Sequence, residues 1–171
     1  MSQETKTRKT NIVLALFVNA RGFGIAVLED ALTVLNAYNV VLHTYPISNQ
    51  KVLEKIKEKI DFYLPSVVIL EDATGYGSRK SKRVKNMISL IEEYAQGASL
   101  PIKKYSRNDI RFVFDLFKAY SKYEIAKVIT ENVKQLPVAL PEKRKSHEPE
   151  HYSMSIFDAI ALGITHFYME E

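Results

Sequence analysis

The 171-residue sequence contains no cysteine, and none of its apolar stretches approaches the roughly 20 residues that a membrane-spanning helix needs. Without cysteine, the chain can form neither a disulfide bond nor a thiolate metal site, which excludes a disulfide-stabilised secreted scaffold. The first ten residues, MSQETKTRKT, are polar and lack the apolar region of a signal peptide. We therefore expect a cytoplasmic protein with no membrane partner and a disordered tail over residues 1–10.

The composition is typical of one globular domain. Hydrophobic residues make up 46% of the chain, which is enough for one sizeable core at this length, so we expect a single domain over residues 11–171. The net charge of +4 is mildly basic, which permits nucleic-acid binding without requiring it. The local clustering of charges is therefore more informative than their sum.

Five short apolar segments bounded by turn residues are predicted to be strands. They cover residues 11–18, 23–28, 32–42, 65–72 and 101–105, with a bulge or break near 36–39. The first three follow one another as a meander, and helices separate the fourth and fifth from it. This order favours a mixed sheet with helices on its faces.

Helical periodicity appears over residues 49–63 and 79–96, between the later strands. Two further helices are predicted to begin at capping boxes, Ser106 with Asp109 and Ser121 with Glu124. A polar, charged segment over residues 141–151 is expected to be a loop, and a last helix follows it.

Three carboxylates stand out from apolar surroundings. Glu71 and Asp72 end the predicted strand PSVVILED (residues 65–72), and strand carboxyl ends are where an open α/β sheet places its chemistry. Asp158 interrupts the apolar string SIFDAIALGIT of the last helix. These acids could converge on a metal ion, with His151, seven residues before Asp158, as a further ligand. The alternative is that each is an ordinary solvated or hydrogen-bonded side chain.

Basic residues cluster directly after this strand, in the string GYGSRKSKRVK. Cations beside a cleft neutralise phosphates, and an aromatic ring can stack on a base, so this segment is a candidate nucleic-acid contact. The alternative is a solvated helix start. The candidate residues are Tyr76, Arg79, Lys80, Lys82, Arg83 and Lys85.

The strings PSVVILED, LPIKKYSRNDIRFVF, SIFDAIALGITHF and ARGFGIAVLE, in this order and spacing, resemble the RuvC family of Holliday junction resolvases. The resemblance implies an α/β, ribonuclease-H-like fold whose mixed five-stranded sheet has three antiparallel strands followed by two parallel ones, with helices on both faces. It also implies a homodimer that binds DNA and uses Mg²⁺ or Mn²⁺. Glu71 matches the family's conserved glutamate, and Asp158 matches its last catalytic aspartate.

Two positions depart from the family pattern. Phe17 stands where the family carries an aspartate on the first strand, and Ser155 stands where another ligand precedes the last aspartate. Phosphodiester hydrolysis of this kind uses two divalent ions about 3.5 to 4 Å apart, and a phenylalanine ring cannot coordinate either. Glu71 and Asp158, helped by Asp72, could hold one ion weakly.

We therefore expect a RuvC-like nucleic-acid-binding protein whose metal-dependent nuclease activity is lost or weakened. A first alternative is an active structure-specific endonuclease with a metal site rebuilt from Glu71, Asp72, Asp158 and His151. A second alternative, from a different class, is a protein-interaction or oligomerisation domain. Whether the chain is an enzyme stays open at this point, and the substitutions argue against it.

Overall fold

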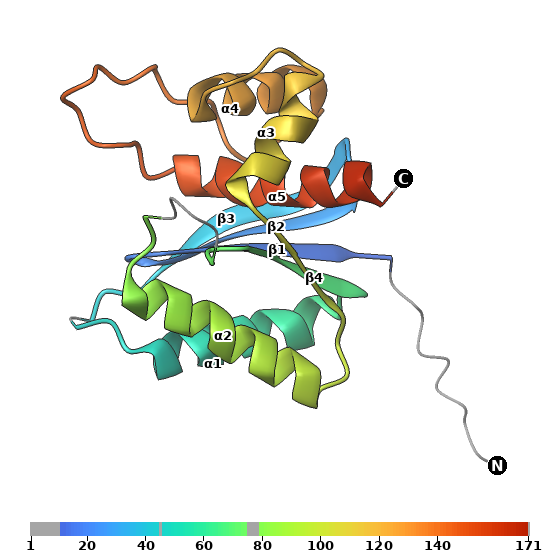
Figure 1. Cartoon of the computed structure of the whole chain (residues 1–171), viewed down its shortest axis with the longest axis vertical. Helices are drawn as coiled ribbons and strands as arrows, with labels where there is room; N and C mark the ends of the chain where they lie inside the picture. The colour runs from blue at the N-terminus through green and yellow to red at the C-terminus, as the bar shows by residue number, and fades with distance from the viewer. Residues whose placement is uncertain (1–10, 45, 75–78, 171) are drawn as a thin grey trace.

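The computed structural model describes residues 11–44, 46–74 and 79–170, which form one mixed sheet covered by helices on both faces (Figure 1). The predicted tail over residues 1–10 lies outside the described residues. The strands are β1 (Val13–Asn19), β2 (Gly22–Asp30), β3 (Thr33–Val41), β4 (Val67–Glu71) and β5 (Ile102–Tyr105). Their order across the sheet is β3-β2-β1-β4-β5, with β1, β2 and β3 antiparallel and with β4 and β5 parallel to β1. This confirms the predicted mixed sheet.

Helices cover both faces of the sheet (Figure 1). The helices are α1 (Asn49–Tyr63), α2 (Lys82–Gly97), α3 (Arg107–Asp115), α4 (Lys122–Asn132) and α5 (Met154–Met169). The helices α3 and α4 begin at the predicted capping boxes, at Ser106 with Asp109 and at Ser121 with Glu124. Among the described residues, no helix is long and apolar enough to cross a membrane.

The central strand β1 is buried on both faces because it contributes side chains to two cores. Alternate residues along a strand point to opposite faces. Val13, Ala15 and Phe17 therefore pack with α3, α4 and α5, whereas Leu14 and Leu16 pack with α1 and α2. This explains why the strand is a continuous apolar run, and it directs Phe17 toward α5.

The helix α5 lies directly on β2 because two glycines permit close contact. A Cβ atom on Gly24 would lie 2.3 Å from the carbonyl oxygen of Ser155, and one on Gly163 would lie 2.4 Å from Leu28 Cδ1. A larger side chain at either position would require the contacting atoms of Ser155 or Leu28 to move. The close packing of α5 against the sheet brings Asp158 down to the carboxyl ends of β1 and β4.

The bulge predicted near residues 36–39 is present, and it adjoins the beginning of that stretch. The strand β3 continues through residues 36–39, and its irregularity lies earlier, where Val27 pairs with Asn36 but Leu28 pairs with Val34. Leu35 is the extra residue at this bulge and is exposed. Pairing with β2 keeps residues 36–39 in the strand despite the low strand propensity of Asn36 and Asn39.

Candidate functional site

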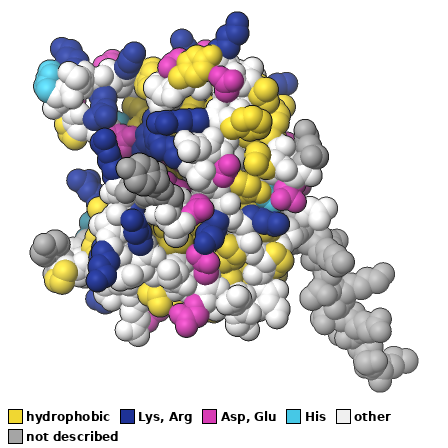
Figure 2. All heavy atoms as spheres, viewed as in Figure 1, with side chains coloured by type: hydrophobic (Ala, Val, Ile, Leu, Met, Phe, Trp, Pro, Cys, Tyr) yellow, Lys and Arg dark blue, Asp and Glu magenta, His cyan; other side chains and the backbone are white. Residues whose placement is uncertain are grey.

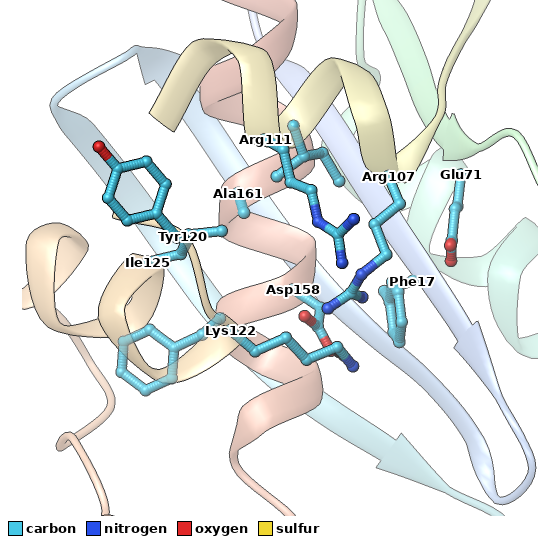
Figure 3. Close-up of a pocket in the computed structure, with 11 residues that line it drawn as sticks. Phe17, Glu71, Arg107, Arg111, Tyr120, Lys122, Ile125, Asp158 and Ala161 are labelled. Atoms are coloured by element: carbon cyan, nitrogen blue, oxygen red, sulfur yellow. Dashed lines mark hydrogen bonds and ion pairs between the residues drawn. The ribbon is translucent and has the colours of Figure 1, made fainter. Parts of the chain in front are cut away.

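A pocket opens at the carboxyl ends of β1 and β4, beneath α3, α4 and α5 (Figure 3). The parallel register pairs Leu16 with Leu70, so the next residues, Phe17 and Glu71, emerge side by side at the strand ends. The residues that line the pocket are Phe17, Glu71, Arg107, Ile110, Arg111, Tyr120, Lys122, Ile125, Phe157, Asp158 and Ala161. The structure thus brings together Glu71, Asp158 and Phe17, three of the residues that the sequence singled out.

Glu71 is paired with Lys80. The two charged groups are 3.2 Å apart, and the side chains are only 12% and 18% exposed respectively. The Lys80 ammonium also donates a hydrogen bond of 2.9 Å to the carbonyl oxygen of Val18, at the end of β1. Burial lowers the pKa of Lys80, while the charge of Glu71 opposes this shift. The cation is thus enclosed in the site.

Asp158 is paired with a second lysine, Lys122, which is the first residue of α4. The Lys122 ammonium lies 3.3 Å from Asp158 and 3.4 Å from Glu150. Burial raises the pKa of Asp158 to about 6, and the positive charge of Lys122 partly offsets this effect. Asp158 is only 14% exposed, so solvent stabilises its negative charge little. The positive charge of Lys122 provides much of the stabilisation instead.

The ring of Phe17 lies beneath both ammonium groups. Lys80 Nζ is 3.6 Å from the ring centroid, and Lys122 Nζ is 5.6 Å from it. Both distances are within the range in which the negative face of an aromatic ring attracts a cation. Phe17, which the sequence resemblance aligned with an aspartate of the RuvC family, therefore lies against two cations of the protein itself.

The outer wall of the pocket carries two arginines that the sequence reasoning missed. Arg107 and Arg111 are one turn apart on α3, and both point into the pocket in Figure 3. Both are exposed, and neither makes an ion pair within the described parts of the chain. The four-residue spacing of the two arginines, at the start of a capped helix, was a signal that could have identified them.

The basic segment before and within α2 divides into an inner and an outer set. Lys80 faces Glu71, and Arg83 donates hydrogen bonds to the carbonyl oxygen of Asn19 and to the side chain of Asn49. Exposed side chains form the outer set, which consists of Arg79, Lys82 and Lys85. The candidate stacking residue Tyr76 lies outside the described residues. Figure 2 shows Lys and Arg side chains gathered on this face, between the two helical layers.

The remaining candidate ligands are engaged elsewhere. Asp72 accepts hydrogen bonds from the Thr74 backbone and hydroxyl, and these bonds lower the pKa of Asp72. His151 hydrogen-bonds the hydroxyl of Ser153. Ser155 donates a hydrogen bond of 2.6 Å to Asn39. None of these three side chains lines the pocket with Glu71 and Asp158.

The donor groups at the pocket do not fit the pair of divalent ions that RuvC-type chemistry implies. Among the described residues, no group of three or more His, Asp or Glu side chains is placed to hold a metal ion. The two carboxylates that line the pocket already have ammonium partners, and Phe17 supplies no donor atom. Mg²⁺ dehydrates reluctantly and needs carboxylate charge and near-octahedral oxygen ligation, which this arrangement does not provide.

Solved structures with the same fold include RuvC and a Holliday junction resolvase. Thermus thermophilus RuvC in complex with a Holliday junction substrate has a TM-score of 0.63 and 18% identity, covering 93% of this chain and 94% of that one. A second structure of Thermus thermophilus RuvC has a TM-score of 0.63 and 20% identity, covering 93% and 95%. The yeast mitochondrial resolvase Ydc2 has a TM-score of 0.56 and 11% identity, covering 94% and 81%.

These likenesses confirm the predicted RuvC-like, ribonuclease-H-like fold over almost the whole chain. No family model matches the sequence, and a sequence search of curated proteins found no match. At these identities the comparison establishes the fold, and the function has to be argued from the pocket itself.

Proposed function

We propose that this protein binds nucleic acid, most simply branched DNA, through the pocket and its basic rim, and that it does not perform two-metal phosphodiester hydrolysis. The observation that carries the proposal is the pairing of Glu71 with Lys80 and of Asp158 with Lys122 above the Phe17 ring. The four charges cancel, so the pocket lacks the negative potential that attracts divalent ions.

The rim supports the binding half of the proposal. Arg107 and Arg111 have no acidic partner among the described residues, and Arg79, Lys82 and Lys85 are exposed on the adjoining start of α2. Unpaired cations beside a concave surface bind phosphates and release condensed counterions, which gives affinity that falls with salt. Guanidinium groups also suit phosphate because they donate two parallel hydrogen bonds. The fold likeness to a RuvC that is seen with a Holliday junction substrate favours a branched DNA ligand.

A cleavage assay tests the catalytic half of the proposal. The purified protein is incubated with labelled four-way junctions, nicked duplexes and single strands in Mg²⁺ and in Mn²⁺. We expect binding without products above the background of a Glu71→Gln variant. Robust cleavage that Glu71→Gln abolishes would overturn the proposal and favour the active endonuclease with a rebuilt metal site.

A second candidate function, protein interaction, is favoured by a different observation. Phe112 and Leu116 on and after α3 are each 70% exposed, and Tyr120 nearby is 60% exposed. Large exposed apolar side chains are common at protein interfaces, including those of homodimers. Absence of nucleic-acid binding at moderate salt, together with a dimer in sedimentation analysis that a Phe112→Ser, Leu116→Ser variant dissociates, would favour this candidate.

A further inference from the structure

The environment of the Lys80 ammonium is built like a cation site. Its nitrogen lies 3.2 Å from a carboxylate oxygen of Glu71, 2.9 Å from the carbonyl oxygen of Val18 and 3.6 Å from the centroid of the Phe17 ring. Carboxylate and carbonyl oxygens are also the ligands that hard divalent cations prefer. We infer that Lys80 is the resident cation of this pocket, and that its removal opens a divalent-cation site that depends on Glu71.

The carboxylate of Glu71 requires a cation. Its Oε2 atom is buried and accepts no well-aligned hydrogen bond from any described group, so the nearby ammonium is its main compensation. A buried carboxylate oxygen without hydrogen bonds is costly unless a positive charge stands close to it. This oxygen of Glu71 therefore has no hydrogen-bond partner among the described residues, and Lys80 supplies the compensating positive charge.

The start of α2 holds Lys80 in position. Ser81, the next residue, caps α2 by accepting a hydrogen bond from the backbone N–H of Val84. Arg83 then donates a hydrogen bond of 3.1 Å to the carbonyl oxygen of Asn19. Lys80 and Arg83 thus both bind the carboxyl end of β1, which fixes the start of α2 beside the pocket. The ammonium is positioned by the fold as well as by attraction to Glu71.

A covalently attached cation excludes a free one. A divalent ion at Glu71 would have to lie about 2 Å from the carboxylate oxygen, in the space that the ammonium already borders. Like charges at this separation repel strongly in a buried site. The ammonium of Lys80 is attached to the chain, so its effective concentration at Glu71 is far higher than the concentration of a free divalent ion in solution. The ion would have to displace it. This reasoning rests on the proposed loss of the two-metal centre and identifies the side chain that maintains it.

Titration with Mn²⁺ tests the inference without any nucleic acid. Mn²⁺ binding to the full chain is followed by electron paramagnetic resonance of the free ion and by calorimetry, for the wild type and for Lys80→Ala. We expect Lys80→Ala to bind Mn²⁺ at least about tenfold more tightly than the wild type, because an uncompensated carboxylate has been added to the site. The gain should disappear in the double variant Lys80→Ala, Glu71→Gln. Lys127→Ala, which removes an exposed lysine of α4, is the matched control and should bind as the wild type does.

Two results would overturn the inference. One is wild-type binding of Mn²⁺ as tight as that of Lys80→Ala, and the other is a folded Lys80→Ala variant that gains no Glu71-dependent binding. If Lys80→Ala does not fold, Lys80→Gln replaces it, since the amide keeps a hydrogen-bond donor without the charge, and the same two results apply. Failure of this test leaves the proposed function standing, whereas Glu71-dependent cleavage by the wild type removes the proposed function.

Discussion

The Lys122 ammonium lies 3.3 Å from the Asp158 carboxylate, and both side chains line the pocket at the carboxyl ends of β1 and β4. Lys122 comes from the first turn of α4, and Asp158 comes from the second turn of α5. The ion pair therefore also links α4 to α5. Its contribution to stability, and its dependence on pH, can be measured separately from any activity.

Asp158 should make the stability of the protein depend on pH between about 4 and 6. Burial raises its pKa to about 6 in the folded protein from the ordinary value of 3.8, so the folded state binds a proton more strongly than the unfolded state over this range. For such a group, stability is greatest below the unfolded pKa and falls as the pH rises through the folded pKa. The shift corresponds to a loss on the order of 3 kcal/mol from this group.

The variant Asp158→Asn checks this expectation, because it removes the titration and keeps the shape. Its free energy of unfolding, measured by urea denaturation, should match that of the wild type near pH 4 and exceed it near pH 7. A difference between variant and wild type that is the same at both pH values would contradict the account of Asp158.

Lys122→Met should destabilise the folded protein, because it leaves Asp158 buried without its close cation. Removing one partner of a partly buried pair costs about 1–3 kcal/mol, less than for a fully buried pair, since Lys122 is partly exposed. Adding Asp158→Asn to Lys122→Met should recover part of the loss. The control is Lys55→Met, which breaks an exposed pair with Glu58 and should change the free energy of unfolding by less than about 1 kcal/mol. Equal losses in the free energy of unfolding for Lys122→Met and Lys55→Met would contradict the expectation that the buried pair contributes more to stability than the exposed one.

Phe17→Leu should weaken the site even though it keeps an apolar side chain. The ring packs in the core and faces the ammonium of Lys80 at 3.6 Å, so the substitution loses packing and a cation–π contact. We expect a loss of about 1–3 kcal/mol in the free energy of unfolding. Phe114→Leu, in the same core and without a cation on its ring in the described structure, is the control for packing alone. Equal losses in the free energy of unfolding for the two variants would argue against a cation–π contribution of Phe17.

Arg107→Gln and Arg111→Gln should each weaken binding to DNA of any sequence. Each loss of a phosphate contact should lower the slope of log affinity against log salt by about 0.9 for duplex DNA. Fluorescence anisotropy over a range of salt concentrations measures both affinity and slope. Lys127→Gln, on the exposed side of α4, should leave both unchanged. Unaltered slopes for both arginine variants would remove the rim from the proposed nucleic-acid surface.

Much of the fold could be predicted from the sequence, because apolar periodicity and turn residues identify elements locally. The capping boxes at Ser106 and Ser121 and the buried strand before Glu71 are examples. Resemblance supplied the expected convergence of Glu71 with Asp158, which are 87 positions apart in the sequence, a contact that no local pattern encodes. The exact position of the bulge, at Leu35, could not be predicted because it depends on pairing with β2.

The candidate site was harder to predict because side-chain direction depends on tertiary packing. Asp72 follows Glu71, but successive side chains alternate along a strand, so adjacency argues against a shared site. Lys80 lies in a segment that is neither helix nor strand, so no helical or strand periodicity could predict that its side chain points toward Glu71. Lys122 enters the pocket only because α4 packs against α5. The nucleic-acid contacts predicted at Lys82 and Lys85 stay predictions.

The most direct measurement is the affinity of the wild-type protein for a labelled four-way DNA junction in EDTA and in millimolar Mn²⁺, at the same ionic strength. If the lysines supply the positive charge of the pocket, the affinity in EDTA should equal or exceed the affinity in Mn²⁺, and the junction should be recovered intact from both. Binding that requires Mn²⁺, or cleavage of the junction that Glu71→Gln abolishes, would contradict the account.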